Sequence, residues 1–408
     1  MNNPQVDVAE LQNRDPEAWT ELLRKVLGTD EVAVTAVTAK RLRTSKDISY
    51  DYPVSRYRLT LRDHTDPITF IGKHTNVAET SFYQICARDF PNLAPACHYL
   101  HVSERGGWLV LDDVPNDFPA LKWTPAHAEQ LIEQVADFHT VYWQADGLSR
   151  LALPHYIEGE PTSLEDLIEA HPAFFEQGPG AVLSEHALNH VGRLAETFLK
   201  AANGLLVMRS LGGWPGILGE THLTAVADLL DDPVPMLEPL KHLPLTLLHG
   251  DLHSHHWQLT LFAESYLLDW QQAMIGPGVL DLVSFTEQFD LIYENGDPAR
   301  LLVRGERPLS DETMIDSYLL TMSARLGKKF DGRAVRRAIP AARCLHVLTH
   351  WLPHFATWFS DMPNKYTWQK VNRLSDEQLI QTPFRAMVSF RPYLSGVFQR
   401  FLQSYKTL

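Results

Sequence analysis

Residues 247–282 are LLHGDLHSHHWQLTLFAESYLLDWQQAMIGPGVLDL, and this stretch decides the fold. An apolar run that ends at Leu248 leads into His-Gly-Asp, whose last residue is Asp251. A second apolar run, 266–268, leads directly into Asp269. Short apolar runs that end in glycine or polar residues are typical of buried strands. We therefore expect two short strands that carry Asp251 and Asp269 to neighbouring loops.

Two carboxylates in this arrangement suit phosphoryl transfer. One of them, Asp251, would position an acceptor hydroxyl and take its proton, and the other, Asp269, would hold Mg²⁺ against nucleotide phosphates. The plainer alternative is a pair of strand-end aspartates that cap turns.

The order of the motifs in this stretch resembles a known superfamily. H-G-D-x-H at 249–253, D-W-Q at 269–271 and G-x-x-x-x-D-L at 276–282 are similar to the signature of the aminoglycoside phosphotransferases and choline kinases. The D-W-Q form is most similar to the ecdysteroid-kinase-like branch. The resemblance implies a two-lobed, protein-kinase-like α+β fold, with a small antiparallel-sheet N-lobe over residues 1–114 and a mainly helical C-lobe over 115–408. ATP would bind between the lobes, and the catalytic loop would span 245–285.

The N-terminal half has counterparts of the other kinase elements. An alternating run at 68–75 predicts a strand that carries Lys73, and Glu79 opens a helical run. The resemblance implies that Lys73 binds the α- and β-phosphates and that Glu79 holds it in place. Without that context, such a pair would be a surface ion pair of little value. The apolar run 106–115 resembles the hinge, where the backbone of Leu111, Asp112, Asp113 and Val114 would contact adenine.

The connection that covers the ATP phosphates in kinases departs from the family pattern. Val- and Thr-rich alternation predicts strands at 31–42 and 54–61. The segment between them, 43–53, contains no glycine, although Ser45, Ser49 and backbone amides could still approach phosphate.

His256 is a second departure, because the superfamily has asparagine five residues after the catalytic aspartate. Mg²⁺ prefers oxygen ligands, so three hypotheses stay open. His256 ligates a softer ion such as Mn²⁺, Asp269 and the phosphates hold the metal alone with Gln258 or a water, or activity is weakened or lost. A further alternative is a zinc site formed by the loop histidines His249, His253, His255 and His256, although no H-E-x-x-H helix or cysteine partner accompanies it.

The C-terminal two thirds are expected to be mostly helical. An amphipathic pattern predicts a helix at 125–143, in which the resemblance gives His139 a structural role. The resemblance also gives Asp281 a structural role, as an anchor of the catalytic loop. Four aromatic residues near the C-terminus are either helix–helix core or the wall of an acceptor pocket; they are Trp351, Trp358, Tyr366 and Trp368.

Composition narrows the class of protein. The 408 residues are 45% hydrophobic and 21% charged, as in a globular protein with a large core. A formal net charge of −14 with no long basic run argues against nucleic acid or an anionic membrane as a partner. The three cysteines form no metal-type cluster, and the N-terminus has no signal-peptide pattern, so we expect a cytoplasmic protein.

The combined prediction is a kinase that uses ATP and Mg²⁺, with Mn²⁺ as the alternative ion, to phosphorylate a hydroxyl of a small molecule. Amino alcohols, sugars, aminoglycosides and steroid-like alcohols all stay open as acceptors, and the sequence does not indicate an oligomeric state. Two alternatives are a nucleotide-binding pseudokinase without turnover and a metal-dependent hydrolase built on the histidine cluster.

Overall fold

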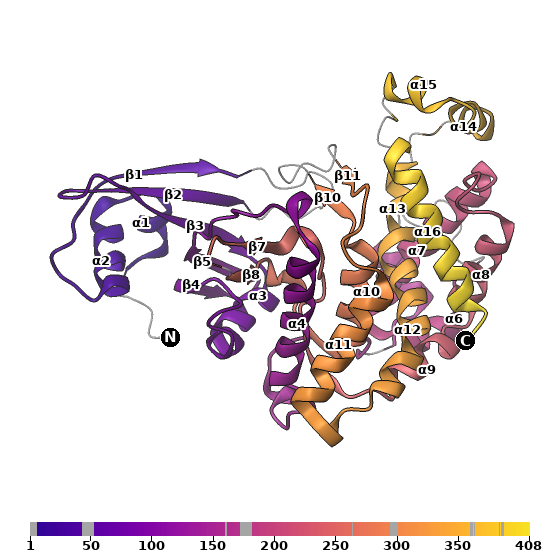
Figure 1. Cartoon of the computed structure of the whole chain (residues 1–408), viewed down its shortest axis with the longest axis horizontal. Helices are drawn as coiled ribbons and strands as arrows, with labels where there is room; N and C mark the ends of the chain where they lie inside the picture. The colour runs from indigo at the N-terminus through magenta and orange to yellow at the C-terminus, as the bar shows by residue number, and fades with distance from the viewer. Residues whose placement is uncertain are drawn as a thin grey trace.

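The structure is a computed structural model that describes residues 6–42, 53–159, 161–171, 182–262, 264–293, 301–359, 362, 364–382, 384 and 387–408. An antiparallel sheet lies at one end of the molecule and a mainly helical body occupies the other (Figure 1). The predicted two-lobed α+β architecture is therefore confirmed. None of the helices in the described part of the chain is both long and apolar enough to cross a membrane.

The N-terminal sheet has five antiparallel strands in the order β1-β2-β3-β5-β4. The strands are β1 (Val34–Arg41), β2 (Val54–Leu61), β3 (Ile68–Thr75), β4 (Cys97–Ser103) and β5 (Gly106–Asp112). Alternating and apolar runs in the sequence predicted four of these strands to within a few residues of each end. It did not predict β4, the edge strand beside β5.

The two faces of the sheet pack against different cores, as the alternation along β5 shows. Trp108 and Val110 join Trp19 and other residues of α1 (Val8–Gln12) and α2 (Pro16–Leu27) in a small core on the outer face. Leu109 and Leu111 point the other way, into the large core shared with the helical body. Because neighbouring strand residues face opposite sides, β5 connects the two cores.

The segment after β3 is a short helix continued by a wider turn. Asn76 is the N-cap residue of helix α3 (Val77–Ser81). Its side-chain oxygen accepts the backbone N–H of Glu79 at 3.1 Å. The π-helical turn η1 (Phe82–Cys86) follows it directly. Glu79 therefore lies in the first turn of α3 rather than at its start.

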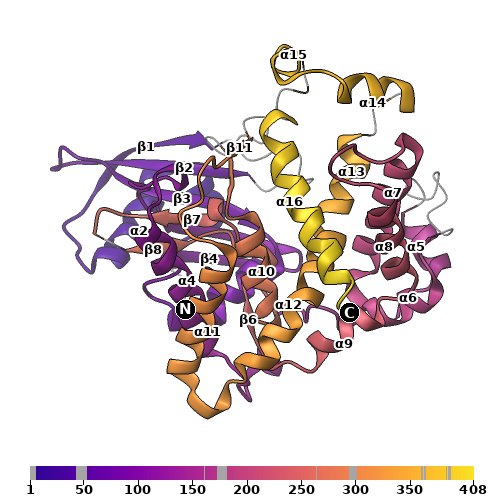
Figure 2. The same cartoon turned by 45° about the vertical axis from the view of Figure 1, so that its right-hand side comes forward.

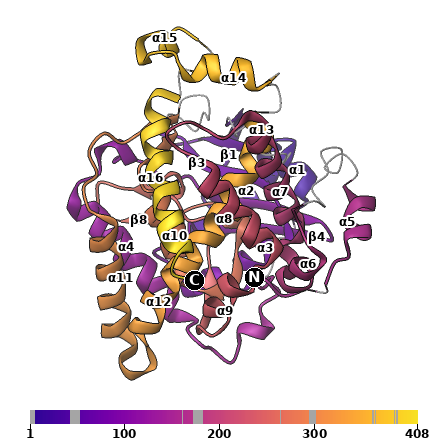
Figure 3. The ribbon, with the colours of Figure 1, turned by 90° about the vertical axis from the view of Figure 1, so that its right-hand side faces the viewer.

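The helical body contains most of the remaining chain (Figures 1 and 2). Its helices are α4 (Pro125–Val141), α5 (Leu164–Ala170), α6 (Glu185–Val191), α7 (Ala195–Leu211), α8 (Glu220–Asp231), α9 (Val234–Lys241), α10 (Val279–Gln288), α11 (Asp311–Leu326), α12 (Gly332–His346), α13 (Leu352–Trp358), α14 (Lys365–Asn372), α15 (Asp376–Ile380) and α16 (Met387–Tyr405). Seen from the helical end, α6, α7 and α8 lie together on one side and α11 lies on the other (Figure 3).

In the described part of the C-terminal region, three two-stranded sheets accompany the helices. They are β6 (Leu245–Leu248) with β9 (Met274–Pro277), β7 (Trp257–Leu259) with β8 (Ser265–Leu267), and β10 (Leu291–Tyr293) with β11 (Leu301–Val303). The strands expected before Asp251 and Asp269 are β6 and β8, which confirms both. They belong to different sheets, so the two aspartates reach the site on separate ribbons.

The backbones of helices α7 and α13 approach each other closely at Gly204. A Cβ atom on Gly204 would lie 1.9 Å from the carbonyl oxygen of Leu352, so no side chain fits between the helices at this point. Gly396, in α16, is a contrasting helical glycine. Its nearest neighbour would be the end of the Arg400 side chain, 3.3 Å away.

We expect Gly204→Ala to lower the free energy of unfolding by about 1–3 kcal/mol, because the added methyl group forces α7 and α13 apart. The matched control, Gly396→Ala, should raise it by about 0.5–1 kcal/mol, because alanine favours a helix and the neighbouring side chain can move. Urea unfolding of both variants measures the difference. A stabilising effect of Gly204→Ala would contradict the close approach of the two backbones.

Candidate active site

A buried lysine lies at the centre of the site. Lys73, on β3, is 7% exposed, and Nζ lies 2.8 Å from Oε2 of Glu79 and 2.7 Å from Oδ1 of Asp269. Burial alone would lower the pKa of Lys73, but the charges and hydrogen bonds of the two carboxylates outweigh it and raise the pKa. The lysine is therefore charged at neutral pH, and the structure brings the neighbouring pair Lys73 and Glu79 together with Asp269, which is 196 positions from Lys73.

Glu79 is fixed by more than the lysine. It is completely buried, and Oε1 accepts the backbone N–H of Trp270 at 3.1 Å while the Thr75 hydroxyl donates to Oε2. The Trp270 ring stacks on Phe82, with ring centroids 3.8 Å apart and planes 7° apart. These contacts attach the segment after β3 to the turn that contains Asp269. Asp269 itself has a left-handed backbone, with φ of 63°.

The turn before Asp251 also requires an unusual backbone. Gly250 has φ of 82°, and a Cβ atom there would lie 2.0 Å from the carbonyl oxygen of Gln272. Only glycine fits this position without moving the chain. The glycine of the H-G-D motif therefore allows the loop to pass close to the segment after Asp269.

Asp281 holds the same loop from the first turn of α10. Its buried carboxylate accepts the backbone N–H of His249 at 2.7 Å and of Gly250 at 3.0 Å. His139 lies behind it, with Nε2 3.3 Å from Asp281 Oδ2 and Nδ1 2.8 Å from the Tyr318 hydroxyl. A carboxylate only accepts, so Nε2 carries the proton and Tyr318 donates to Nδ1. The structural roles expected of His139 and Asp281 match these contacts.

His256 lies between the two catalytic-loop aspartates. Its Nδ1 donates to the backbone carbonyl of Asp251 at 2.9 Å, which leaves the lone pair of the neutral ring on Nε2. Nε2 lies 3.7 Å from Oδ2 of Asp269. Burial, reinforced by the neighbouring His253, lowers the pKa of His256 to about 3, so the ring is neutral at working pH. Two electron-pair donors thus face each other at a separation that one cation can bridge, and a divalent metal fits here.

A second possible ligand group shares this loop. Ligand atoms of Asp251, His253 and His256 all lie within 4.8 Å of one another. However, Nδ1 of His253 accepts the backbone N–H of His255 at 3.2 Å, so the proton of the neutral ring is on Nε2, which points toward Asp251 Oδ2 at 3.7 Å. In this arrangement His253 is a donor to Asp251 rather than a metal ligand, which weighs against the zinc alternative.

The Asp251 carboxylate has an unusual electrostatic environment. Burial would raise its pKa. The electrostatic interactions with His253 and His256, together with a hydrogen bond to His253, outweigh burial and hold the pKa well below its usual range. Asp251 is therefore an ionised hydrogen-bond acceptor at any physiological pH. A group with so low a pKa orients a hydroxyl well but keeps a proton poorly.

The predicted hinge follows β5 into the helical body. Leu111 and Asp112 pair with β3, and the Asp112 N–H donates to the Ala96 carbonyl at 3.0 Å. The side chain of Asp112 lies 2.6 Å from His98, and that of Asp113 makes two contacts to Arg56, at 2.7 and 2.9 Å. The adenine contact of the four hinge residues stays a prediction. Asp113 and Val114, which follow the paired strand, are its best candidates.

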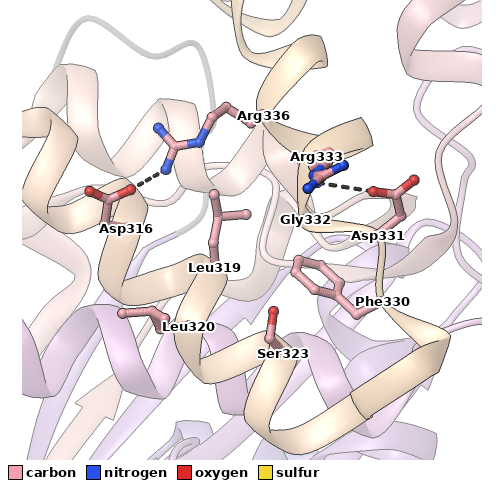
Figure 4. Close-up of a pocket in the computed structure, with 9 residues that line it drawn as sticks. All are labelled: Asp316, Leu319, Leu320, Ser323, Phe330, Asp331, Gly332, Arg333 and Arg336. Atoms are coloured by element: carbon pink, nitrogen blue, oxygen red, sulfur yellow. Dashed lines mark hydrogen bonds and ion pairs between the residues drawn. The ribbon is translucent and has the colours of Figure 1, made fainter.

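Most of the glycine-free segment, 43–52, with Ser45 and Ser49, lies outside the described residues. An open hollow of about 570 Å³ between α11 and α12 is lined by Leu319, Phe330 and the Asp316–Arg336 ion pair (Figure 4). Its lining includes none of the predicted site residues.

Comparison with known families supports the interpretation of this geometry. Residues 123–313 match the phosphotransferase enzyme family. The matched segment contains Asp251, Asp269 and Asp281, and it confirms the superfamily that the sequence motifs predicted. The narrower assignment to the ecdysteroid-kinase-like branch stays a prediction. A comparison with curated proteins finds no match.

Several solved structures are similar over most of this chain. A choline kinase from Cryptosporidium parvum is 13% identical, with 96% of each chain covered and a TM-score of 0.46. An ethanolamine kinase from Plasmodium vivax is 10% identical, with 87% of each chain covered and a TM-score of 0.45. An aminoglycoside phosphotransferase from Alicyclobacillus acidocaldarius is 12% identical, with 86% of this chain and 89% of that chain covered and a TM-score of 0.43.

We expect Lys73→Met to lower the free energy of unfolding by about 3–5 kcal/mol, because it leaves the carboxylate of Glu79 buried without its counter-charge. Adding Glu79→Gln should recover part of this loss, giving a coupling of about 0.5–3 kcal/mol in a double-mutant cycle. Losses that simply add would show that the two residues do not act as a pair.

An exposed ion pair supplies the control for this cycle. Lys25 and Glu21 lie on successive turns of α2, with charged atoms 4.0 Å apart and side chains 52% and 51% exposed. Lys25→Met should cost less than about 1 kcal/mol, because solvent already screens this pair.

Proposed function

We propose that this protein is an ATP-dependent phosphotransferase that phosphorylates a hydroxyl group of a small molecule. The observation that carries the proposal is the contact of Lys73 with both Glu79 and Asp269, beside the loop of Asp251. A lysine on a strand, a glutamate on the following helix and two aspartates on separate loops are the parts that phosphoryl transfer uses. The match of residues 123–313 to phosphotransferase enzymes supports the same reaction class.

In the proposed reaction the acceptor hydroxyl donates a hydrogen bond to the Asp251 carboxylate. Its oxygen attacks the γ-phosphorus of ATP, the bond from that phosphorus to the β–γ bridging oxygen breaks, and ADP leaves. The hydroxyl proton moves to Asp251 late in this step, because the low pKa of Asp251 makes it a weak base. It then passes to solvent or to the product phosphate.

The lysine and the metal donors act on the nucleotide. Lys73 would contact the α- and β-phosphates, and Glu79 would hold its ammonium group in position. Asp269 and His256 are the residues that would hold a divalent cation, which when bound neutralises phosphate charge. The Asp269 oxygen that faces His256 is Oδ2, whereas Lys73 contacts Oδ1, so the two functions use different atoms.

A nucleotide-binding protein without turnover is the second candidate. The histidine at position 256 favours it, because Mg²⁺ binds imidazole less readily than oxygen ligands. The intact set of Lys73, Glu79, Asp251 and Asp269 favours the enzyme. ADP production, scanned over a library of hydroxylated metabolites, separates the two candidates.

Asp251→Asn should lower turnover by about 10²–10⁴-fold with nucleotide binding retained, because the amide neither holds a negative charge nor accepts the hydroxyl proton. ADP release and nucleotide affinity measure the two effects separately. Asp137→Asn, which alters a half-exposed aspartate paired with Arg325 on α11, is the matched control and should keep wild-type turnover. Unchanged turnover in Asp251→Asn would remove this carboxylate from the mechanism.

His256→Asn should shift metal preference from Mn²⁺ toward Mg²⁺, because an amide oxygen is a harder ligand than an imidazole nitrogen. His256→Ala should weaken metal activation further, because it leaves Asp269 without its facing donor. Activation curves for Mg²⁺ and Mn²⁺ on the three proteins measure the metal midpoints. Identical midpoints in all three would show that His256 does not contact the ion.

A further inference from the structure

A row of aromatic rings follows one face of the helices near the C-terminus. His346, His350, His354 and Trp358 are spaced by four residues, and we call them the ring row. Neighbouring ring centroids lie 5.0, 5.1 and 5.1 Å apart, so the row is continuous. These separations limit the length of the row to about 15 Å between the ring centroids of His346 and Trp358.

The backbone under the row is irregular at one point. The helix α12 ends at His346, the π-helical turn η13 (Val347–Trp351) follows, and α13 continues to Trp358. A π turn inside a longer helix is rare and is frequent at functional sites, because it changes the direction in which side chains project. Across this turn the His350 ring contacts the rings of both His346 and His354.

His346 and His350, the inner half of the ring row, lie within electrostatic range of the Asp251 loop. The charge of Asp251 acts on both His346 and His350, and His253 also acts on His350. The outer end of the row is open to solvent, because Trp358 is 39% exposed. The row therefore extends from the predicted phosphorylation point toward solvent.

The ring row offers hydrogen-bonding nitrogens and ring faces rather than charges. Burial lowers the pKa of His346 to about 4, and it holds the pKa of His350 well below its usual range, so both rings are neutral at pH 7. Nε2 of His346 is buried and has no hydrogen-bond partner among the described residues. A neutral ring with an unused nitrogen suits a hydroxyl or carbonyl group of a bound molecule.

The carboxylate behind His346 is not available to a ligand. Glu287 is 4% exposed, and its oxygens bind Arg400 at 2.6 Å and Arg343 at 2.9 Å. Its charge is therefore already balanced by two guanidinium groups. Among the described residues, the carboxylates that act on His346 and His350 are this paired Glu287 and Asp251 itself.

We propose that the ring row is the acceptor-binding wall, and that the acceptor is an uncharged, ring-containing alcohol rather than an ammonium compound. This inference rests on the proposed phosphotransferase function, because it assigns the substrate class of the same site. The neutral nitrogens would bind polar groups near the reacting hydroxyl, and the ring faces toward Trp358 would cover a flat portion of the acceptor. The length of the row suits a molecule longer than a simple amino alcohol.

Matched pairs of alcohols that differ in charge test the proposal. The probes are 3,3-dimethylbutan-1-ol against choline, myo-inositol against 2-deoxystreptamine, and glucose against glucosamine, each with the full-length protein, ADP and Mg²⁺. Binding is measured by saturation-transfer NMR titration. We expect the uncharged member to bind at least tenfold more tightly in the ring-containing pairs. Equal binding, tighter binding of the ammonium member, or no binding of any uncharged probe would overturn the proposal.

Variants of His350 test whether the ring row causes the preference for uncharged alcohols. His350→Glu places a carboxylate in the row and should reverse the preference, with at least a tenfold gain for the ammonium members. His350→Gln keeps the position neutral and should keep the preference, which guards against a folding defect in the glutamate variant. His242→Glu is the matched control, because the His242 side chain is 80% exposed beside Glu238 on α9. An unchanged preference in His350→Glu, with the fold intact by circular dichroism, would overturn the proposal.

Measuring ADP release with ATP and the same probes distinguishes a failure of the acceptor-binding wall from a failure of the proposed phosphotransferase function. If uncharged probes bind selectively but no compound of the metabolite library causes ADP release, the proposed phosphotransferase function is contradicted. The proposal that the ring row binds an uncharged molecule is then still supported. If an ammonium acceptor causes more ADP release than its uncharged partner, the phosphotransferase function is supported. The proposal that the ring row selects an uncharged acceptor is then overturned.

Discussion

The contact of one buried ammonium group with two carboxylates connects the two lobes of this protein. Moving a lysine charge out of water costs several kcal/mol unless close partners compensate for it. Here Glu79 from the N-lobe and Asp269 from the helical body supply that compensation at 2.8 and 2.7 Å. The lysine is therefore stable only when β3, α3 and the Asp269 turn are all in place. Correct assembly of the lobes and formation of the proposed phosphate site are thus the same event.

Asp281 imposes an independent constraint on the other catalytic loop. Its carboxylate binds two successive backbone N–H groups, so it fixes the path of the main chain through His249 and Gly250 rather than any one side chain. The hydrogen bonds behind it, through His139 to Tyr318, come from α4 and α11. Asp269 is thus positioned from the N-lobe and Asp251 from three helices of the body. The two aspartates are therefore held mainly from different sides, and the hydrogen bond from His249 to the Leu268 carbonyl joins their two loops.

Local sequence patterns predicted the parts of this site whose determinants are local. Strand alternation located Lys73, and the apolar runs located Asp251 and Asp269, because each depends on a few adjacent residues. The contact of His139 with Tyr318 joins residues 179 positions apart, and no pattern in either helix indicates it. The aromatic residues at the C-terminus show the same limit. Trp351 and Trp368 are in the core at 1% and 0% exposure, whereas Trp358 and Tyr366 are exposed, a division that helical spacing alone does not give.

His249 and His256 both fix the backbone of the Asp251 loop through one ring nitrogen and leave a lone pair on the other. His249 donates from Nε2 to the Leu268 carbonyl at 2.8 Å, and its Nδ1 faces the Asp251 N–H at 3.4 Å. His256 donates from Nδ1 to the Asp251 carbonyl, and its Nε2 faces Asp269. Each ring uses its one N–H to fix the backbone and keeps its lone pair for the other side. Asparagine could make the same two contacts through its amide, with oxygen toward the ion. A histidine at position 256 would therefore preserve the support of the loop and change only the donor atom that is offered to the proposed cation.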